Sequence, residues 1–350
     1  MWGFAVNIEL VEYDSAWPGL FERERARILG VLPDAVLEHV GSTSVPGLCA
    51  KPVIDLMLVV DDPLDEASYV PALEAAGYRV TVREDDWHDH RILKGPDTNI
   101  NLHVFPRGCA QVRRHLLFRD WLRDNAEDRE LYASTKRTLA ARVWERVQDY
   151  AAAKNAVVLD ILERAYLARP VEPGEVEFVT ETPPHNAPVL LEDHNPAWAR
   201  WFAAEEAKIR AALGEKVVRL EHVGSTSVPG LAAKPLIDIL LIVPDSADED
   251  AYVPALLEAG YYLRLRERVW HEHRLLKGTE PNVNLHVYSP RCEELDRMLA
   301  FRDRLRAFPA DREEYERTKR ELAGRTWKRV QDYADAKTRV VERIILRALG

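Results

Sequence analysis

The stretch Glu38–Leu48 reads EHVGSTSVPGL, and the same eleven residues return at Glu221–Leu231. A shift of 183, which takes Glu38 to Glu221, aligns the two copies without a gap into the C-terminal tail, and most pairs between Val36 and Phe105 are identical. A solenoid repeats a unit of about 20–50 residues, so a period this long indicates duplication of a whole domain. We therefore expect two copies of one fold, each with its own core.

Length and composition also favour two globular domains. The chain has 350 residues, of which 47% are hydrophobic and 30% charged, and single cores stop growing at about 100–200 residues. No apolar run approaches the roughly 18 residues of a membrane helix, and the start, MWGFAVNIEL, lacks the basic flank of an export signal. Cys49, Cys109 and Cys292 are too few and too scattered for a disulfide framework. We expect a cytoplasmic protein without a membrane partner.

A proline-rich segment separates the copies. Residues 169–188 contain five prolines, a composition typical of a stiff, extended linker. We therefore expect copy 1 at residues 1–168, the linker at 169–188 and copy 2 at 189–350. If single-copy relatives pair, joining two copies makes that contact intramolecular. The chain is then expected to be a monomer that forms a pseudo-dimer within itself.

The hydrophobic pattern of copy 1 predicts a helix followed by two strands. Trp17–Leu32 has helical spacing, and Val36–Val40 is a short apolar strand. Val53–Val60 reads VIDLMLVV, which is apolar almost throughout and too short for a helix of its own. We expect it to be a central strand that is covered on both faces.

The rest of copy 1 predicts more strands and a helical end. A helix is expected at Leu64–Ala76, with Gly77 at its C-cap. Apolar residues at helical spacing over Ala110–Tyr166 indicate two or three helices. The further strands are expected at Tyr78–Val82, Arg91–Lys94 and Asn99–Phe105. The predicted fold class is α/β or α+β, with a mixed sheet, flanking helices and a C-terminal helical segment in each copy.

The quoted stretch has the composition of a phosphate-binding turn. Gly41 follows a strand directly and supplies a permissive backbone. Ser42, Thr43 and Ser44 then supply hydroxyls and exposed amides at the predicted start of a helix. Taken alone, such a turn is also explained as a plain helix N-cap.

A carboxylate in the following strand strengthens the phosphate-binding interpretation. Asp55 stands inside the apolar run, where a carboxylate is costly to bury unless it serves a metal, a cation or a hydrogen-bond donor. A Gly-Ser turn followed by a strand aspartate resembles the nucleotidyltransferase superfamily related to DNA polymerase β. More specifically, GSTSVPGL-x-AKP-x-ID, then N-x-NLHV and FRD-x-LR, is similar in both copies to the GrpB family, which is assigned to that superfamily.

The resemblance covers both copies from the first helix through the helical tail. It implies two tandem nucleotidyltransferase-like domains, in which the Gly-Ser turn holds phosphates and the strand carboxylate holds magnesium. One departure matters, because the superfamily strand usually carries two acids two residues apart that share a metal. Met57 and Leu240 occupy those second positions here. A two-metal site of the usual kind is therefore not expected, and catalysis has to recruit other ligands.

Histidines and asparagines supply those other ligands. Eight of the eleven histidines occupy four paired positions, since His39, His88, His90 and His103 all recur in copy 2. On an extended strand His88 and His90 project from one face, and Asn101 and His103 do the same on theirs. If this polar face adjoins the strand aspartate, the combination suits zinc or manganese better than magnesium alone. For His39 we favour a structural hydrogen bond.

The residues that we expect at the site form three groups. The catalytic candidates are Asp55, His103, Asp238 and His286. The phosphate- or nucleotide-binding candidates, which include cations positioned to neutralise phosphate oxygens, are Gly41, Ser42, Thr43, Ser44, Lys51, Arg91, Lys94, Gly224, Ser225, Thr226, Ser227, Lys234, Arg274 and Lys277. The candidate metal ligands are Asp55, His88, His90, Asp238, His271 and His273, and the divalent metal is open between magnesium, manganese and zinc.

The charge distribution favours a small ligand. A net charge of −10 does not favour a long nucleic acid as partner. The segment Arg107–Lys154 nevertheless holds 11 Lys and Arg against 7 Asp and Glu, which suits a small phosphate-bearing ligand or a nucleotide. Arg119 and Arg123 share a helix face, as do Tyr132 and Lys136. These residues form either ion pairs on a solvated face or a basic lid over a bound anion.

Three functions are consistent with this pattern. The leading hypothesis is a GrpB-like nucleotidyltransferase-fold protein that binds a nucleotide or other phosphate ligand in each copy and transfers a nucleotidyl or phosphoryl group. The missing second acid favours an alternative from another class, a non-catalytic nucleotide- or coenzyme-binding or regulatory module. The histidines leave a further alternative open, a metal-dependent hydrolase of phosphate esters.

Overall fold

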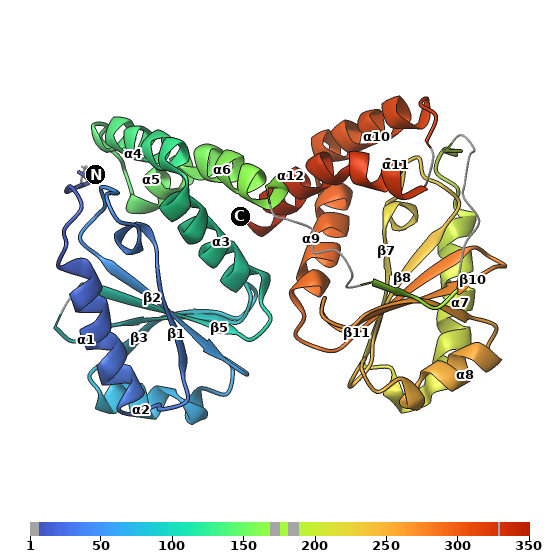
Figure 1. The fold of residues 1–350 in the computed structure, drawn as a ribbon, viewed down its shortest axis with the longest axis horizontal. Helices are drawn as coiled ribbons and strands as arrows, with labels where there is room; N and C mark the ends of the chain where they lie inside the picture. The colour runs from blue at the N-terminus through green and yellow to red at the C-terminus, as the bar shows by residue number, and fades with distance from the viewer. Residues whose placement is uncertain (1–6, 98, 169–175, 181–188, 328–329) are drawn as a thin grey trace. The chain divides into compact units, whose positions relative to one another are not determined.

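The chain folds into two units, each with a sheet and helices of its own (Figure 1). The computed structural model describes residues 7–97, 99–168, 176–180, 189–327 and 330–350. The first unit runs to Arg169, and the second runs from Pro170 to Leu349. Among the residues that the structure describes, no helix combines the length and the apolar character needed to cross a membrane.

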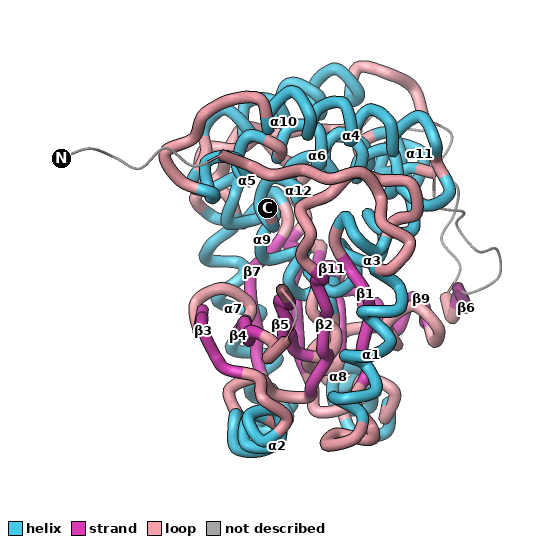
Figure 2. Tube along the Cα trace, turned by 90° about the vertical axis from the view of Figure 1, so that its left-hand side faces the viewer, coloured by secondary structure: helices cyan, strands magenta, loops and turns pink. Residues whose placement is uncertain are grey.

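The first unit contains a five-stranded mixed sheet in the order β1-β2-β5-β4-β3. Its strands are β1 (Val36–Val40), β2 (Ile54–Val60), β3 (Arg79–Glu84), β4 (His90–Lys94) and β5 (Ile100–Pro106). The β2 and β5 strands are parallel and lie side by side (Figure 2), whereas all other neighbours are antiparallel. The mixed α/β fold predicted from the sequence is confirmed.

One face of this sheet carries the main hydrophobic core. The side chains of Leu56, Leu58, Leu102 and Val104 are at most 1% exposed, and they pack against two helices. These helices are α1 (Trp17–Leu29) and α2 (Val70–Ala75). Because side chains alternate along a strand, the residues between these apolar positions point to the opposite face of the sheet.

Helices lie beyond that opposite face at the C-terminal end of the unit (Figure 1). They are α3 (Ala110–Asp124), α4 (Ala126–Ala140), α5 (Val147–Ala153) and α6 (Asn155–Leu167). The sequence predicted two or three helices here. Asn125 explains one of the extra boundaries, because its side chain accepts a hydrogen bond from the Asp128 amide at 3.0 Å and so caps the start of α4.

The helix predicted at Leu64–Ala76 is wrong in its extent. The structure has a 3-10 turn at Glu66–Ser68 and then the short α2. Pro71 lies in the first turn of α2, where a proline is well tolerated because the amide it lacks would have no intrahelical partner. The α2 helix therefore begins next to Pro71, and no continuous helix runs from Leu64 to Ala76.

The second unit repeats this arrangement with one strand more. Its six-stranded sheet has the order β6-β9-β10-β11-β8-β7. The strands are β6 (Val176–Phe178), β7 (Arg219–Val223), β8 (Ile237–Ile242), β9 (Tyr262–Glu267), β10 (His273–Gly278) and β11 (Val283–Tyr288). The helices are α7 (Ala197–Leu213), α8 (Val253–Glu258), α9 (Glu293–Ala307), α10 (Pro309–Ala323), α11 (Val330–Ala336) and α12 (Thr338–Leu349).

The extra strand comes from the segment predicted to be the linker. The β6 strand pairs antiparallel with β9, so that Val176 lies opposite Glu267. Glu177 strengthens the pairing through an ion pair with Arg266 at 2.7 Å. The described part of the linker segment is therefore an edge strand of the second sheet.

Candidate functional site

A row of polar side chains crosses the face of the first sheet that is turned away from α1 and α2. Asp55 on β2 lies opposite Asn101 on β5, and Met57 lies opposite His103. On the other side of β5, Lys94 of β4 lies opposite Asn101. The period of two along each strand places all of these side chains on one face, so three strands supply a common polar surface.

The carboxylate of Asp55 is held by its neighbours on β5. Its side chain is 27% exposed, and its Oδ1 accepts a hydrogen bond from Asn101 Nδ2 at 2.7 Å. Nε2 of His103 lies 3.8 Å from the same oxygen. Burial by itself would raise the pKa of Asp55, but His103, Asn101 and the Lys51 ammonium hold that pKa below its usual value. The carboxylate is therefore ionised at neutral pH.

A chain of hydrogen bonds fixes the orientation of His103. Its Nδ1 lies 3.0 Å from Nε2 of His90, whose Nδ1 in turn lies 2.7 Å from Oε2 of Glu84. Burial lowers the pKa of His90, so this ring is neutral and has one N–H, which it donates to the Glu84 carboxylate. Nε2 of His90 then accepts from Nδ1 of His103, and this contact turns Nε2 of His103 toward the Asp55 carboxylate.

The Gly-Ser turn meets the same carboxylate from its other side. Gly41 has a φ of 70°, and a Cβ at this position would lie 2.5 Å from Oδ2 of Asp55. Only glycine fits, both because of the left-handed backbone and because of the close approach. Ser44 donates to the Gly41 carbonyl at 2.6 Å, and Thr43 donates to the Val53 carbonyl at 3.1 Å. Two of the three hydroxyls in the turn therefore hold the turn itself together.

The third hydroxyl of the turn meets a buried lysine from the helical segment. Nζ of Lys136 on α4 donates to Oγ of Ser42 at 3.1 Å and to the carbonyl of Cys49, and it lies 4.6 Å from the centre of the Tyr132 ring. The residue is only 2% exposed. Burial lowers the pKa of Lys136 to about 7, so a proton is held on this amine weakly enough to respond to a ligand.

These groups line a cavity of about 470 Å³. Three lysines face it, namely Lys51 before β2, Lys136 on α4 and Lys154 after α5, and burial lowers the pKa of each of them. Among the described residues that line the cavity, Asp55 is the single carboxylate. His103 faces the cavity as well. The balance of three ammonium groups against one carboxylate makes this cavity a site for an anion.

The second unit reproduces the arrangement. Oδ1 of Asp238 accepts from Asn284 Nδ2 at 2.7 Å and lies 3.8 Å from Nε2 of His286. The cavity beside it measures about 320 Å³. It is lined by the turn at Ser225 and Thr226 and, again, by a single carboxylate among the residues described. Its four lysines are Lys234, Lys277, Lys319 and Lys337.

Arg91 does not belong to this site, and the prediction that placed it there is wrong. Arg91 and Lys94 are three residues apart on β4, an odd spacing, so the Arg91 side chain points to the other face of the sheet. There it is 3% exposed and forms ion pairs with Glu66 and Asp85, both at 2.7 Å. Arg274 is bound to Glu249 in the same way, at 2.6 Å.

The three-ligand metal set that included His88 is also not brought together. His88 has a φ of 55° and precedes β4, which begins at His90, so the two rings do not share a strand face as predicted. Both nitrogens of His90 are already hydrogen-bonded within the chain to Glu84 and His103. In copy 2, His271 has a φ of 54°, and His273 binds Glu267 and His286.

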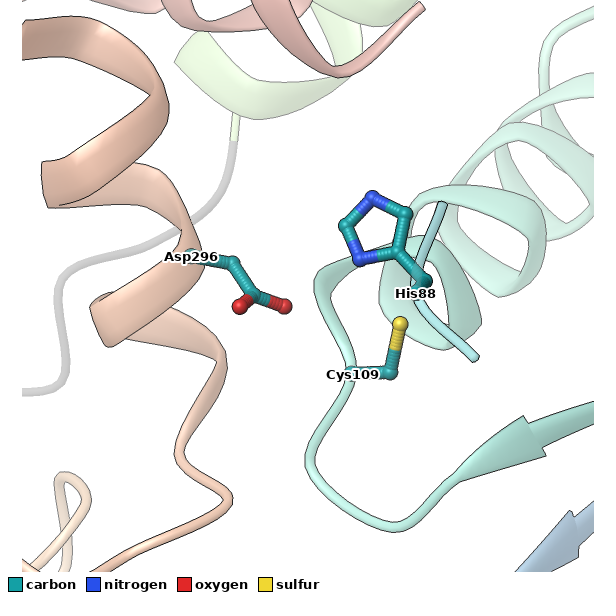
Figure 3. Close-up of side chains that lie close together, drawn as sticks. All are labelled: His88, Cys109 and Asp296. Carbon is teal, nitrogen blue, oxygen red and sulfur yellow. The ribbon is translucent and has the colours of Figure 1, made fainter. Parts of the chain in front are cut away.

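His88 lies beside the start of α3 instead. Its ring and the Cys109 thiol have donor atoms within 4.8 Å of each other (Figure 3). Asp296, the third side chain drawn in that figure, belongs to the second unit. Of the catalytic residues and ligands predicted for the first unit, Asp55 and His103 are therefore the two described residues that remain for a metal ion, with Asp238 and His286 as their counterparts.

Sequence reasoning did not assign to the site three residues with polar side chains that line the first cavity. Tyr150 and Lys154 come from α5 and its C-terminal end, and His115 comes from α3. Tyr150 and Lys154 recur in copy 2 as Tyr333 and Lys337, but so do most residues, and that repetition alone could not single them out.

The family profile described as "GrpB protein" matches residues 7–164 and again residues 188–347. The chain belongs to the GrpB family. A UPF0157 protein of Halalkalibacterium halodurans is 57% identical over 161 residues, which are 45% of this chain and 83% of that protein. A UPF0157 protein of Streptomyces coelicolor is 46% identical over 166 residues, or 47% of this chain and 88% of that protein. Each of these relatives matches about one GrpB copy.

Among solved structures, the crystal structure of a conserved GrpB protein from Enterococcus faecalis is 32% identical to this chain. It covers 46% of this chain and 97% of that one, with a TM-score of 0.39. The two profile matches establish that GrpB domains are present in tandem here, as the sequence predicted.

Proposed function

We propose that each GrpB copy binds a phosphate-bearing ligand, a nucleotide or another polyphosphate, in its lysine-lined cavity and transfers a nucleotidyl or phosphoryl group from it. The observation that carries this proposal is the charge balance of the two cavities. Three lysines face Asp55 in copy 1, and four face Asp238 in copy 2. Buried cations destabilise a protein unless an anion compensates them, and neither aspartate is sufficient to do so.

A divalent ion fits this site only together with its ligand. Asp55 and His103 would hold the ion in copy 1, since Oδ1 of Asp55 and Nε2 of His103 lie 3.8 Å apart and both residues line the cavity. Two protein donors leave the other positions to phosphate oxygens and water, the pattern of Mg²⁺ and Mn²⁺ rather than of zinc. When bound, the ion would polarise a phosphoryl oxygen and neutralise developing charge. The surrounding lysines disfavour the ion without a polyphosphate.

In this proposal, some residues bind the phosphates and others position His103. Lys136 and Lys154 neutralise phosphate oxygens, and Ser42 and the backbone of the turn orient the phosphate chain. Glu84 and His90 do not touch the ligand. They orient His103 so that its Nδ1 contacts His90 and its Nε2 faces Asp55.

A non-catalytic binding module is the second candidate, because one observation favours it. Met57, at the position where the superfamily carries its second acid, is 0% exposed and packs with Val40 and Phe105 in an apolar cluster. No second carboxylate is available from β2 for a two-metal mechanism. A phosphate-ester hydrolase built on His88 and His90 has no comparable support, since those rings do not face the cavity together.

Calorimetric titration of the full chain with tripolyphosphate and with each nucleoside triphosphate tests the proposal. The runs are made in EDTA, in Mg²⁺ and in Mn²⁺, and the mixtures are then analysed for products by mass spectrometry. We expect two tight binding events for the unaltered chain and no tight binding event for a chain that carries both Lys136→Met and Lys319→Met. Binding that survives both substitutions, or no binding by the unaltered chain, would contradict the proposal. Binding without product in any metal would favour the binding module.

A further inference from the structure

A second cavity of about 250 Å³ adjoins the lysine-lined cavity of copy 1. Gly41, Ser42, His115 and Tyr132 line both cavities, so the two meet at the Gly-Ser turn. We call the second cavity the annex. Its other lining residues are Val45, Arg114, Phe118, Arg119, Leu122, Val158 and Leu162.

The annex is apolar in its body and polar at its edge. Leu122 and Leu162 are at most 1% exposed, and the ring of Phe118 stands edge-on to Tyr132 with centroids 5.2 Å apart. Arg119 forms a fixed wall, since Glu38 binds its guanidinium at 2.7 Å. Aromatic rings and guanidinium planes around an apolar pocket are the surroundings in which a nucleobase binds.

A hydrogen-bond acceptor stands where the annex joins the phosphate cavity. Nδ1 of His115 lies 2.8 Å from the Gln111 carbonyl, which can only accept, so Nδ1 carries the proton. Burial lowers the pKa of His115 to about 4, and the ring is therefore neutral with an unprotonated Nε2. Because His115 lines both cavities, this nitrogen can accept a hydrogen bond from a ligand that spans them, and the hydroxyls of a ribose between phosphate and base are donors.

Copy 2 differs at the corresponding positions. Met298 replaces His115, so the acceptor is lost. Arg297, the counterpart of Arg114, forms ion pairs with Glu294 at 3.1 Å and with Glu342 at 2.6 Å. These pairs fix the guanidinium between α9 and α12.

Copy 1 has neither of those two acids. The positions of Glu294 and Glu342 are occupied there by Gln111 and Leu159. The acceptor at the entrance is therefore present only in copy 1, and the acids at the positions of Glu294 and Glu342 are present only in copy 2.

We propose that the two copies take different parts of the same ligand class. Copy 1 holds the nucleoside of a nucleotide in the annex while the phosphates lie against the lysines, and copy 2 recognises the polyphosphate alone. This inference rests on the proposed function, since it needs a phosphate in each lysine-lined cavity. It adds which copy distinguishes a nucleotide from an inorganic polyphosphate and which side chains do so.

The test compares ATP with inorganic tripolyphosphate at one copy at a time in the full chain. Lys234→Met with Lys319→Met disables copy 2, and Lys51→Met with Lys136→Met disables copy 1. Stacking of a base contributes about 1–3 kcal/mol, so copy 1 is expected to bind ATP about tenfold or more tightly than tripolyphosphate. Copy 2 is expected to bind the two probes within about threefold of each other, since it gains little of that contribution.

A matched pair of substitutions then locates the effect. Val158→Trp fills the annex from α6 and is expected to abolish the preference of copy 1 for ATP, with the affinity for tripolyphosphate unchanged. Val341→Trp makes the same change in copy 2 and is expected to leave both affinities as they were. His115→Met, a milder change to the residue that copy 2 carries, is expected to reduce the preference of copy 1 and serves if the tryptophan variant fails to fold.

The outcomes separate the inference from the proposed function. If both copies bind tripolyphosphate but show the same gain with ATP, the inference is overturned and the phosphate-binding function stands. The same holds if the preference of copy 1 survives both Val158→Trp and His115→Met. If neither copy binds tripolyphosphate, the proposed function fails and the inference fails with it.

Discussion

The two GrpB copies share the same geometry around the strand aspartate and differ in the helices that cover it. The distances from the strand aspartate to its asparagine and its histidine are 2.7 and 3.8 Å in both copies. Around α3 and α9, in contrast, His115 corresponds to Met298, and an arginine that lines a cavity in copy 1 is held by two acids in copy 2. The comparison teaches that the sheet face and the helical cap can change separately.

The largest expected effect is weaker tripolyphosphate binding at one copy with binding at the other copy unchanged. Lys136→Met is expected to weaken tripolyphosphate binding at copy 1 by about 10- to 100-fold, because it removes a buried charged donor worth about 1.5–3 kcal/mol. Lys319→Met is expected to do the same at copy 2. Calorimetry should show the number of tight sites falling from two to one in each variant. The exposed Lys216→Met serves as the control, and a loss at both copies from a single variant would argue against independent sites.

The aspartates test whether the two copies share a metal-dependent step. Asp55→Asn removes the one negative charge facing the lysines of copy 1, so tripolyphosphate binding in EDTA is expected to tighten by about threefold or more. Any gain in affinity from Mn²⁺ is expected to vanish at that copy. Asp238→Asn should behave identically at copy 2. If the gain from Mn²⁺ persists in both variants, the ion is not held by these carboxylates.

The pH dependence of binding should be the same in the two copies. The pKa of Lys136 and that of Lys319 are both lowered to about 7 by burial. Below about 7 the amines already carry the proton that the anion requires, whereas above 7 binding has to take up a proton. The affinity for tripolyphosphate is therefore expected to fall as the pH rises from 7 to 9, by up to about tenfold per pH unit. Affinities that stay constant over this range would contradict a role for the two lysines.

In the ligand-free chain, the two lysines change the free energy of unfolding with pH in the direction opposite to their effect on affinity. The unfolded state holds these protons up to the ordinary lysine pKa of 10.5, and the folded state releases them near 7. The unfolded chain thus binds more protons between these values, so the contribution of the two lysines to the free energy of unfolding rises with pH in this window. Denaturant titrations of the unaltered chain and of the chain with Lys136→Met and Lys319→Met, compared at pH 7 and 9, measure that difference.

The last prediction concerns the stability of the turn that both copies share. Gly41→Ala places a Cβ against Asp55 in a left-handed backbone, whereas at Gly47, with a φ of 78°, nothing lies within 4 Å of the added atom. Gly47→Ala is expected to cost about 1 kcal/mol through the backbone alone. Gly41→Ala should cost more by a further amount of the same order. Thermal unfolding measures both, and equal losses would mean that the carboxylate moves aside freely.

Much of the fold could be predicted because local periodicity encodes it. The duplication, the strand at Val36–Val40 and the buried strand around Asp55 follow from identity and alternation, and the structure confirms them. The helix boundaries were less well predicted, because single residues such as Pro71 and Asn125 set them. The intramolecular pseudo-dimer stays a prediction.

The site could be predicted in part, for a related reason. Asp55 and His103 lie on neighbouring strands of one face, and alternation is enough to bring them together. Lys136 reaches Ser42 from 94 residues away, and no local pattern states which helix face a distant turn will meet. Arg91 and Lys94 are three residues apart on β4, so alternation directs their side chains to opposite faces, and Arg91 binds Glu66 outside the site.

The short strand β6 has a practical consequence for anyone who wishes to study the halves separately. A fragment that begins at residue 170 retains Val176–Phe178 and with it the partner of β9. A fragment that begins at residue 189 lacks β6, so the backbone of β9 has no partner strand on that edge. Exposed sheet edges of this kind pair with other chains. A second half that starts at residue 189, after the proline-rich linker, would therefore be prone to self-association, for reasons unrelated to its chemistry.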